Sequence, residues 1–206
     1  MNRTRTWTLG DANERGNEAK YTFYIPPEDT LSRLSKGSFV KLIFDCDVEN
    51  ENGWSAERMW VEITHREGDC FKGNLDNDPN YIPDLTAGDV IEFGINHIIQ
   101  TDIEDEEPNI VEKYSTRCFA TSAVLYDGQS VEIMYREEPT EEQDNYSGWT
   151  FINGHETEEY LDNGDNWHYV SLGAVLNRCD RFVHLLDAPY DTQYTWNQST
   201  QTYEES

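Results

Sequence analysis

Acidic side chains constrain the fold of this chain more than any other feature of its sequence. The 206 residues include 41 Asp and Glu against 15 Lys and Arg, a formal net charge of −26 at pH 7. Because ionised carboxylates stay at the surface, the core has to come from the hydrophobic residues, which make up only 36% of the chain. Low hydropathy with high charge is also typical of disorder. The six Trp, twelve Tyr and eight Phe argue against disorder and predict a core rich in aromatic rings.

The negative charge is spread evenly along the chain. Residues 1–107 carry 10 basic and 23 acidic side chains and residues 108–206 carry 5 and 18, so each half has a net charge of −13. Such a field repels nucleic acids and anionic membranes, and it accelerates the encounter with basic proteins. We therefore expect a protein partner, with no nucleic acid and no membrane. An acidic surface that only keeps the protein soluble is the alternative.

Cysteine spacing and the N-terminal segment predict a cytoplasmic protein. The four cysteines form no Cys-x-x-Cys pair, and their wide spacing predicts buried free thiols rather than disulfides or a zinc ribbon. The first residues lack the apolar stretch of a signal peptide, and no apolar run is long enough to span a bilayer. The sequence predicts no particular oligomeric state.

Short β-branched and aromatic segments in both halves predict an α+β fold, with two small strand-rich units, mostly antiparallel sheets and a few short helices. Residues 1–20 are polar and are interpreted as a leader. The acidic run at 101–108 should be extended by charge repulsion, which separates a domain at 21–107 from a second domain at 108–206. Asp127-Gly128 lies between two apolar runs and predicts a hairpin. Strands are expected at 38–45, 58–64, 70–75, 90–93, 118–126, 130–136, 148–153 and 192–203, and short helices at 28–35, 156–161 and 181–186.

None of the common catalytic motifs is present: there is no nucleophile elbow, P-loop, Rossmann fingerprint or zincin helix. Asn74, Asp76 and Asp78 imitate the start of a calcium-binding loop. That loop needs Gly at position 6 and Glu at position 12, where this chain has Pro79 and Leu85. The five histidines show no metal-ligand spacing. We therefore predict no catalytic residue, no metal site and no cofactor, and a protein that is not an enzyme.

One stretch of the second half combines many carboxylates with aromatic residues that can serve as contact anchors. It begins at 135–139, continues through an acidic loop to 147–149 and ends at 165–166. A surface of this composition suits a basic, substrate-binding cleft on another protein, because Trp and Tyr supply anchors and carboxylates supply steering. The predicted partner-binding residues are Glu137, Glu138, Glu141, Glu142, Trp149, Glu156, Glu159 and Asp162.

Short motifs in a fixed order connect residues 114–196 to a known family. They are Cys-Phe-Ala-Thr-Ser at 118–122, Met-Tyr-Arg-Glu-Glu-Pro at 134–139, Ser-Gly-Trp at 147–149, Gly154, Glu156, Glu-Tyr-Leu-Asp at 159–162, Leu-Leu-Asp at 185–187 and Pro189. Together they resemble the bacterial immunity protein 33 family. The resemblance implies a protein that protects its producer by binding a cognate secreted toxin in the cytoplasm, and it supplies no catalytic residue.

Motifs in the first half resemble a second, small bacterial domain of unknown function, and they imply no activity. These motifs are Val-Lys-Leu-Ile-Phe at 40–44, Glu-Arg-Met-Trp-Val at 57–61, Gly-Asn-Leu-Asp-Asn-Asp-Pro at 73–79, Gly88-Asp89 and Phe93.

Inhibition of a bacterial toxin, by an acidic surface that occludes its active site, is the leading hypothesis. A small-molecule or carbohydrate-binding module is one alternative, since carboxylates and aromatic rings also line sugar-binding grooves. An uncharacterised hydrolase that uses a pair of acidic residues is another, and a scaffold protein without inhibitory action is a third. A deep cavity ringed by converging titratable groups would favour the hydrolase.

Overall fold

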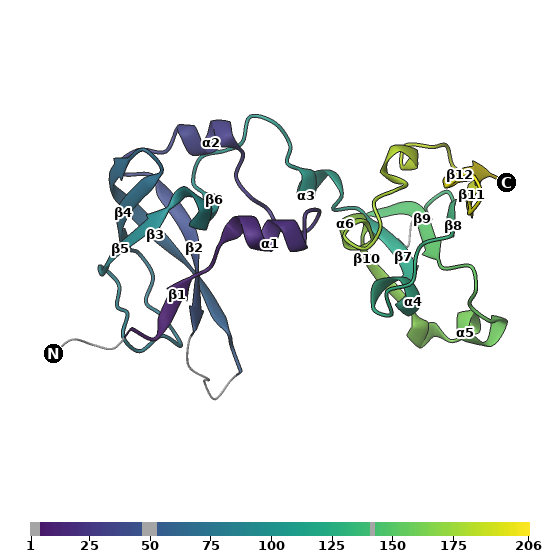
Figure 1. Cartoon of the computed structure of the whole chain (residues 1–206), viewed down its shortest axis with the longest axis horizontal. Coiled ribbons are helices and arrows are strands. Elements are labelled where there is room, and N and C mark those ends of the chain that lie inside the picture. Colours follow the sequence, from purple (N-terminus) through teal and green to yellow (C-terminus); the bar gives the residue numbers. More distant parts are fainter. Residues whose placement is uncertain (1–4, 47–52, 141–142) are drawn as a thin grey trace. The chain divides into compact units, whose positions relative to one another are not determined.

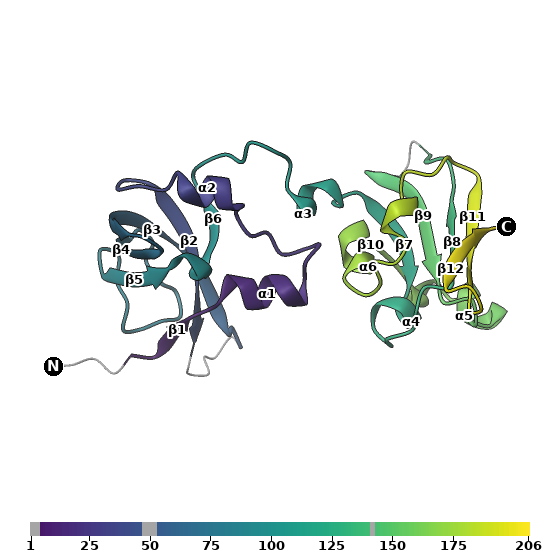
Figure 2. The same cartoon turned by 45° about the horizontal axis from the view of Figure 1, so that its top comes forward.

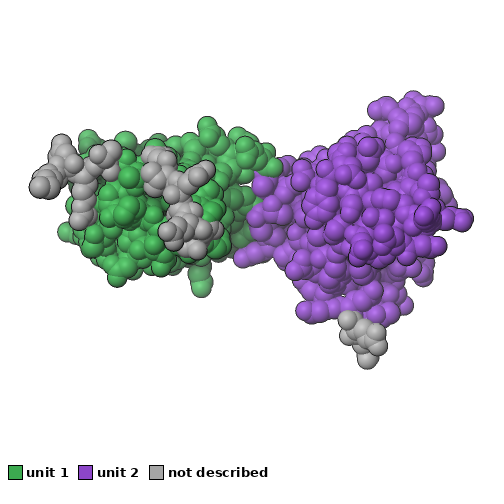
Figure 3. All heavy atoms as spheres, turned by 90° about the horizontal axis from the view of Figure 1, so that it is seen from below, with its two compact units in different colours: residues 1–18, 23–109 green, residues 19–22, 110–206 purple. Residues whose placement is uncertain are grey.

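The structure is a computed structural model, and it describes residues 5–46, 53–140 and 143–206. The chain divides into two compact units (Figure 1 and Figure 3): unit 1 comprises residues 1–18 and 23–109, and unit 2 comprises residues 19–22 and 110–206. In the described parts of the chain, each unit has one six-stranded sheet and a main hydrophobic core of its own. The predicted α+β fold with mostly antiparallel sheets is confirmed.

Unit 1 is built on an antiparallel sheet in which period-2 alternation places one face in the core. Val61 and Ile63 are fully buried, whereas Glu62 between them is exposed. The strands are β1 (Trp7–Leu9), β2 (Phe39–Cys46), β3 (Ala56–Glu67), β4 (Cys70–Leu75), β5 (Val90–Gly94) and β6 (Ile98–Thr101), and the helices are α1 (Ala12–Glu18), α2 (Glu28–Ser32) and the 3-10 helix η1 (Ile95–His97). The sheet order is β1-β2-β3-β4-β5, and β6 also pairs with β2.

The predicted polar leader at residues 1–20 is wrong. Its strand β1 pairs antiparallel with β2, and Trp7 lies opposite Cys46. The Trp7 ring is buried against Phe44, with the ring centroids 5.1 Å apart. Helix α1 follows, and residues 19–22 belong to unit 2, where Tyr21 is buried. The structural division falls between residues 109 and 110 rather than between 107 and 108.

Unit 2 has a mixed sheet in the order β10-β7-β9-β8-β11-β12 (Figure 2). Strands β7 and β9 are parallel, and the other neighbouring pairs are antiparallel. The strands are β7 (Arg117–Thr121), β8 (Ile133–Arg136), β9 (Tyr146–Ile152), β10 (Trp167–Ser171), β11 (Thr192–Asn197) and β12 (Thr202–Glu205). The helices are α3 (Ile110–Lys113), α4 (Ser122–Leu125), α5 (Glu158–Asp162), α6 (Leu172–Leu176) and the 3-10 helices η2 (Gly164–Asn166) and η3 (Val183–Leu185).

The hairpin predicted across Asp127-Gly128 is wrong. Strand β7 ends at Thr121 and helix α4 follows at once, burying Val124 and Leu125 in the core of unit 2. Strand β9 then lies between β7 and β8. Gly128 does adopt a positive φ of 71°, so the glycine provides a turn within a longer connection rather than a two-residue hairpin turn.

Thiol burial differs from the prediction, although all four cysteines are free. Cys118 is buried, and burial raises the pKa of its thiol. Cys46 and Cys179 are partly buried, and Cys70 is exposed.

Across the described residues, no helix has the length and apolar character needed to cross a membrane.

Candidate functional site

Trp149 is a core residue, so its prediction as a contact anchor is wrong. Its side chain is fully buried. The indole Nε1–H donates to the carbonyl oxygen of Leu186 at 3.1 Å, and the ring stacks on Phe151 at a centroid distance of 6.0 Å. The Arg136 guanidinium lies 5.7 Å from the ring centroid. A ring enclosed in this way is not available to a partner.

Glu156 is a structural carboxylate at the turn that follows β9. Its Oε1 accepts hydrogen bonds from the Thr121 hydroxyl at 2.9 Å and from the Asn153 N–H at 2.7 Å, and its Oε2 accepts from the Gly154 N–H at 2.6 Å. Burial acts to raise the pKa of Glu156, but these hydrogen bonds outweigh it and the pKa is lowered. The side chain therefore serves mainly to close this turn.

The exposed acidic residues of the predicted site lie beyond the two ends of β9 and do not form one patch. Glu137 and Glu138 follow β8 and lead towards the start of β9, whereas Glu159 and Asp162 belong to α5, beyond its other end. Strand β9 has seven residues, which corresponds to roughly 20 Å of extended chain. Glu141 and Glu142 lie outside the described residues.

One face of the unit 2 sheet is covered by helices. Cross-strand partners point to the same side of a sheet, and the partners Ala120, Phe151 and Met134 all belong to the core of unit 2. Val124 of α4 and Val175 of α6 pack into the same core, and Figure 2 shows these helices beside β10 and β7.

The opposite face, which we call the open face, carries aromatic and hydroxyl side chains. Its residues alternate along the strands with those of the helix-covered face. The Tyr169 side chain is 36% exposed and that of Gln193 is exposed, whereas Phe119 and Tyr135 are partly buried. A row of direct cross-strand partners defines this face: Tyr169 on β10, Phe119 on β7, Thr150 on β9, Tyr135 on β8 and Gln193 on β11.

Ring contacts and hydrogen bonds fix the side chains of the open face. The Phe119 ring lies 5.0 Å from that of Tyr169 and 5.4 Å from that of Tyr146. The Thr150 hydroxyl lies 3.1 Å from the Tyr146 hydroxyl. Burial raises the pKa of the Tyr135 and Tyr146 phenols, so both stay protonated at neutral pH.

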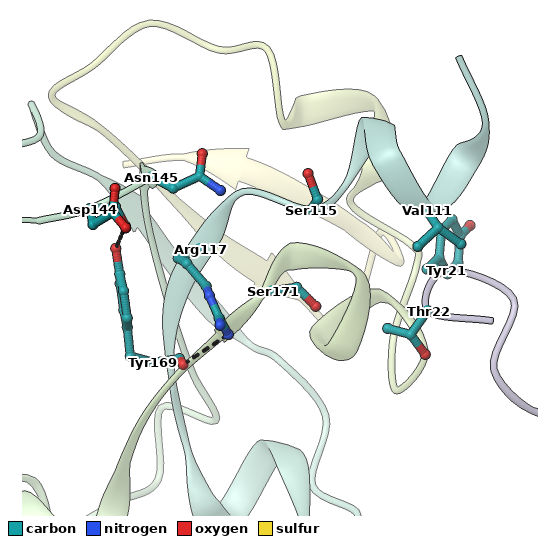
Figure 4. Close-up of a pocket in the computed structure, with 9 residues that line it drawn as sticks. All are labelled: Tyr21, Thr22, Val111, Ser115, Arg117, Asp144, Asn145, Tyr169 and Ser171. Carbon is teal, nitrogen blue, oxygen red and sulfur yellow. Dashed lines mark hydrogen bonds between the residues drawn. The ribbon is translucent and has the colours of Figure 1, made fainter. Parts of the chain in front are cut away.

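A hollow of about 610 Å³ adjoins the open face at the start of β7 (Figure 4). Arg117 is the one basic residue among those that line it. Its Nη1 donates to the carbonyl oxygen of Tyr169 at 3.4 Å, and the Tyr169 hydroxyl donates to the carbonyl oxygen of Asp144 at 2.5 Å. The lining residues all belong to unit 2: Tyr21, Thr22, Val111, Ser115, Arg117, Asp144, Asn145, Tyr169 and Ser171.

Two other clusters among the described residues bring polar and titratable groups together. Ser122 Oγ lies 2.6 Å from His168 Nε2, but neither residue lines a hollow described in this structure. In unit 1, a hollow of about 360 Å³ is bordered by Cys70 and by the Lys72–Glu92 ion pair, which measures 2.6 Å. Within the described ranges, no group of three or more His, Cys, Asp or Glu side chains could hold a metal ion.

Comparison with protein families identifies the chain. Residues 17–152, more than half of its length, match the model for an uncharacterized protein conserved in bacteria, DUF2314. The chain belongs to the DUF2314 family. Residues 118–206 match the Immunity protein Imm33 domain. No curated protein and no solved structure matches the chain.

Both resemblances noted in the sequence are confirmed. The residue ranges of the two matches can be compared with the two structural units. The Imm33 match lies entirely within unit 2 and covers nearly the whole of its sheet. The DUF2314 match crosses from unit 1 into unit 2 and ends with β9, so this family is not confined to the first half. The open face and its hollow therefore lie in the part of this DUF2314-family chain that carries the Imm33 domain.

Sequence reasoning missed the open face because its residues are far apart in the chain. A signal was present: Arg117, Phe119 and Thr121 alternate with Cys118 and Ala120 in period 2. The alternation separates two faces but does not say which face the helices cover. That choice depends on α4 and α6, which are too short to show a helical period.

Proposed function

We propose that this chain is an immunity protein that binds a cognate bacterial toxin in the cytoplasm and neutralises it by occluding its active site. The Imm33 match across residues 118–206 carries this proposal, because it places unit 2 in an immunity-protein family. Such a protein acts by binding and needs no catalytic group of its own.

Charge supports a basic toxin surface as the target. The chain has a net charge of −26, and an acidic inhibitor attracts a basic cleft over distances comparable to the Debye length. Exposed carboxylates lie beyond both ends of β9, which allows steering from either end of the sheet. A cleft that binds phosphate groups, as in a nuclease, has the complementary charge.

Growth rescue and binding kinetics test the proposal together. The protein encoded by the gene next to this chain's own is the candidate toxin, and it is expressed in a bacterial host with and without this chain in the cytoplasm. Rescue of growth is expected, together with a direct complex of the two purified proteins. The association rate should fall steeply as salt rises from 50 to 500 mM, because screening removes the steering, while the dissociation rate changes less.

Three results would argue against the proposal. A toxin that stays fully active in the presence of excess chain would contradict neutralisation. An association rate that does not change with salt concentration would contradict electrostatic steering of the toxin by the acidic surface. Hydrolysis of generic glycosides or esters that is lost on replacement of a single Asp or Glu would favour the hydrolase alternative instead.

A further inference from the structure

We propose that the toxin docks on the open face of unit 2 and places one of its own carboxylates in the hollow beside Arg117. This inference rests on the proposed function and adds the contact surface and the chemistry of the partner. The surface consists of Tyr169, Phe119, Tyr135 and Gln193, with Arg117 at its edge.

The composition of the open face is the first observation. A sheet with helices on one side only usually presents polar side chains on its other side. Here Phe119, Tyr135 and Tyr169 occupy that side, and none of these three residues belongs to a hydrophobic core of the protein. Tyrosine and phenylalanine are enriched in protein interfaces, where they supply much of the binding energy.

The second observation is that the rings are held in place before any partner arrives. The Tyr146 hydroxyl is bonded to Thr150 and the Tyr169 hydroxyl to the backbone at Asp144, and the Phe119 ring packs against both tyrosine rings. All the rings stand on hydrogen-bonded strands. A contact surface that is already ordered loses little conformational entropy on binding, so more of the contact energy appears as affinity.

Strand β10 adds an unpaired edge beside these rings. It is the terminal strand of the sheet, and the Leu172 N–H bonds the Thr116 carbonyl oxygen at 2.8 Å. In an antiparallel pair, bonded and non-bonded residue pairs alternate. Counting back from Leu172–Thr116, the pair Val170–Cys118 is again a bonded one, and the next pair, Tyr169–Phe119, is therefore non-bonded. The backbone N–H and C=O of Tyr169 therefore point away from β7, towards the edge of the sheet, where the carbonyl oxygen accepts the bond from Arg117.

Arg117 is the third observation. Residues 108–206 contain 18 acidic side chains, yet none of the carboxylates in the described part of the chain forms a salt bridge with Arg117. Its guanidinium makes a long bond of 3.4 Å to the Tyr169 carbonyl oxygen and lies 5.9 Å from the centroid of the Tyr169 ring. Arginine presents a planar fork of donors that fits a carboxylate, and the hollow leaves room for one.

Electrostatics decide what kind of partner brings this carboxylate. The field of an acidic protein repels small free anions, nucleic acids and a second copy of this chain. Three exposed carboxylates lie at this end of the sheet. Asp144 lines the hollow, and Glu137 and Glu138 follow β8 near the start of β9. A partner that is basic around its rim, with an acidic side chain at its centre, satisfies both the surrounding carboxylates and Arg117. A toxin with a basic cleft and an acidic active-site residue has this pattern.

The test compares open-face variants with matched variants of the helix-covered side. The probe is the candidate toxin encoded by the neighbouring gene, in a variant that no longer arrests growth, with affinity measured by calorimetry. Tyr169→Ala is paired with Tyr126→Ala, since Tyr126 is 65% exposed and follows α4. Arg117→Glu is paired with Arg178→Glu, which changes the net charge equally at an exposed position after α6. Circular dichroism checks the fold of each variant.

Each open-face variant should weaken binding by about 30-fold or more, the scale of a hot-spot residue, and each control by less than about 3-fold, the scale of a near-neutral contact. Gln193→Arg adds bulk and positive charge at an exposed position of the same row, so it should also weaken binding even if Tyr169→Ala fails to fold. Reversing the charge of one toxin carboxylate should restore binding to Arg117→Glu.

The outcomes separate this inference from the proposed function. If the wild-type chain binds the toxin and the open-face variants bind as tightly as it does, the docking surface is wrong and the function stands. Loss of binding in the helix-side variants alone would also show that the docking surface is wrong, and it would leave the proposed function standing. If Gln193→Arg dissolves a dimer of this chain, the face belongs to a second copy. If the wild-type chain does not bind the toxin, both proposals fail.

Discussion

Replacing Trp149 with Phe tests the division between core and contact surface. The substitution keeps an aromatic ring but removes the Nε1–H that bonds the Leu186 carbonyl oxygen. A buried carbonyl left without its donor costs about 1–3 kcal/mol, and the cavity around the smaller ring adds about 1 kcal/mol. Unit 2 should therefore lose roughly 2–4 kcal/mol of stability, which lowers its Tm by about 10 °C or more.

Urea denaturation followed by far-ultraviolet circular dichroism measures this loss, and calorimetry at low temperature measures toxin affinity. Trp54→Phe is the control, because Trp54 is 55% exposed and stacks on Tyr81 in unit 1. It should change stability by less than about 0.5 kcal/mol. Affinity of folded Trp149→Phe should match the wild type. Unchanged stability with a collapse of affinity would show that Trp149 contacts the toxin and would refute the assignment of the two faces.

Three further predictions address the turn after β9, the positive-φ glycine within β9 and the acidic residues at the ends of the sheet. Glu156→Gln should destabilise unit 2 at pH 7 in urea titrations. Since the pKa of Glu156 is lowered on folding, its contribution is present above the unfolded pKa of about 4.3 and is lost as the pH falls through the folded value, so the stability difference between the two proteins should shrink steadily as the pH falls below the unfolded pKa. Gly148→Ala should lower the Tm by at least about 5 °C, because Gly148 has a φ of 87° and a Cβ there would press on the Glu137 carbonyl oxygen. The double variant Glu137→Lys with Glu138→Lys should slow toxin association in stopped-flow measurements about 10-fold or more, because both carboxylates are exposed at the hollow end of β9.

Each of these has its own control. Gly128→Ala also places an alanine at positive φ, but nothing lies within 4 Å of its Cβ position, so it should cost less than Gly148→Ala. Glu159→Lys with Asp162→Lys changes the net charge equally at the other end of β9. Equal slowing by both double variants would contradict docking at the hollow end. A stability difference between Glu156→Gln and wild type that does not shrink as the pH falls would contradict the role given to its carboxylate.

Strands that carry their own pattern were predictable from the sequence. The segments at 38–45, 58–64 and 70–75 alternate or run apolar between clear turn residues, and they appear as β2, β3 and β4, with the predicted hairpin closed by Glu67 opposite Cys70. The helices at 28–35 and 156–161 also appear, although shorter, as α2 and α5. In these segments local propensity and tertiary pairing agree.

Features that depend on distant partners were not predictable. The polar segment 1–20 supplies a three-residue strand because one ring, Trp7, is buried against Phe44 of β2. The Asp-Gly turn does not make a hairpin because β9, more than fifteen residues later, takes the place beside β7. Trp149 has the same local sequence whether it is a contact anchor or a core ring. Only the pairing of β9 with β7 and β8 directs it inward.

Hydroxyl-radical footprinting of the toxin complex tests the central claim most directly, because it reports the solvent access of individual aromatic side chains. Tyr169, Phe119 and Tyr135 should become less reactive when the toxin is bound, whereas Tyr126 on the helix-covered side should react at the same rate in the free chain and in the complex. Protection of Tyr126 with unchanged reactivity at Tyr169 and Phe119 would place the toxin on the other side of unit 2 and contradict the account.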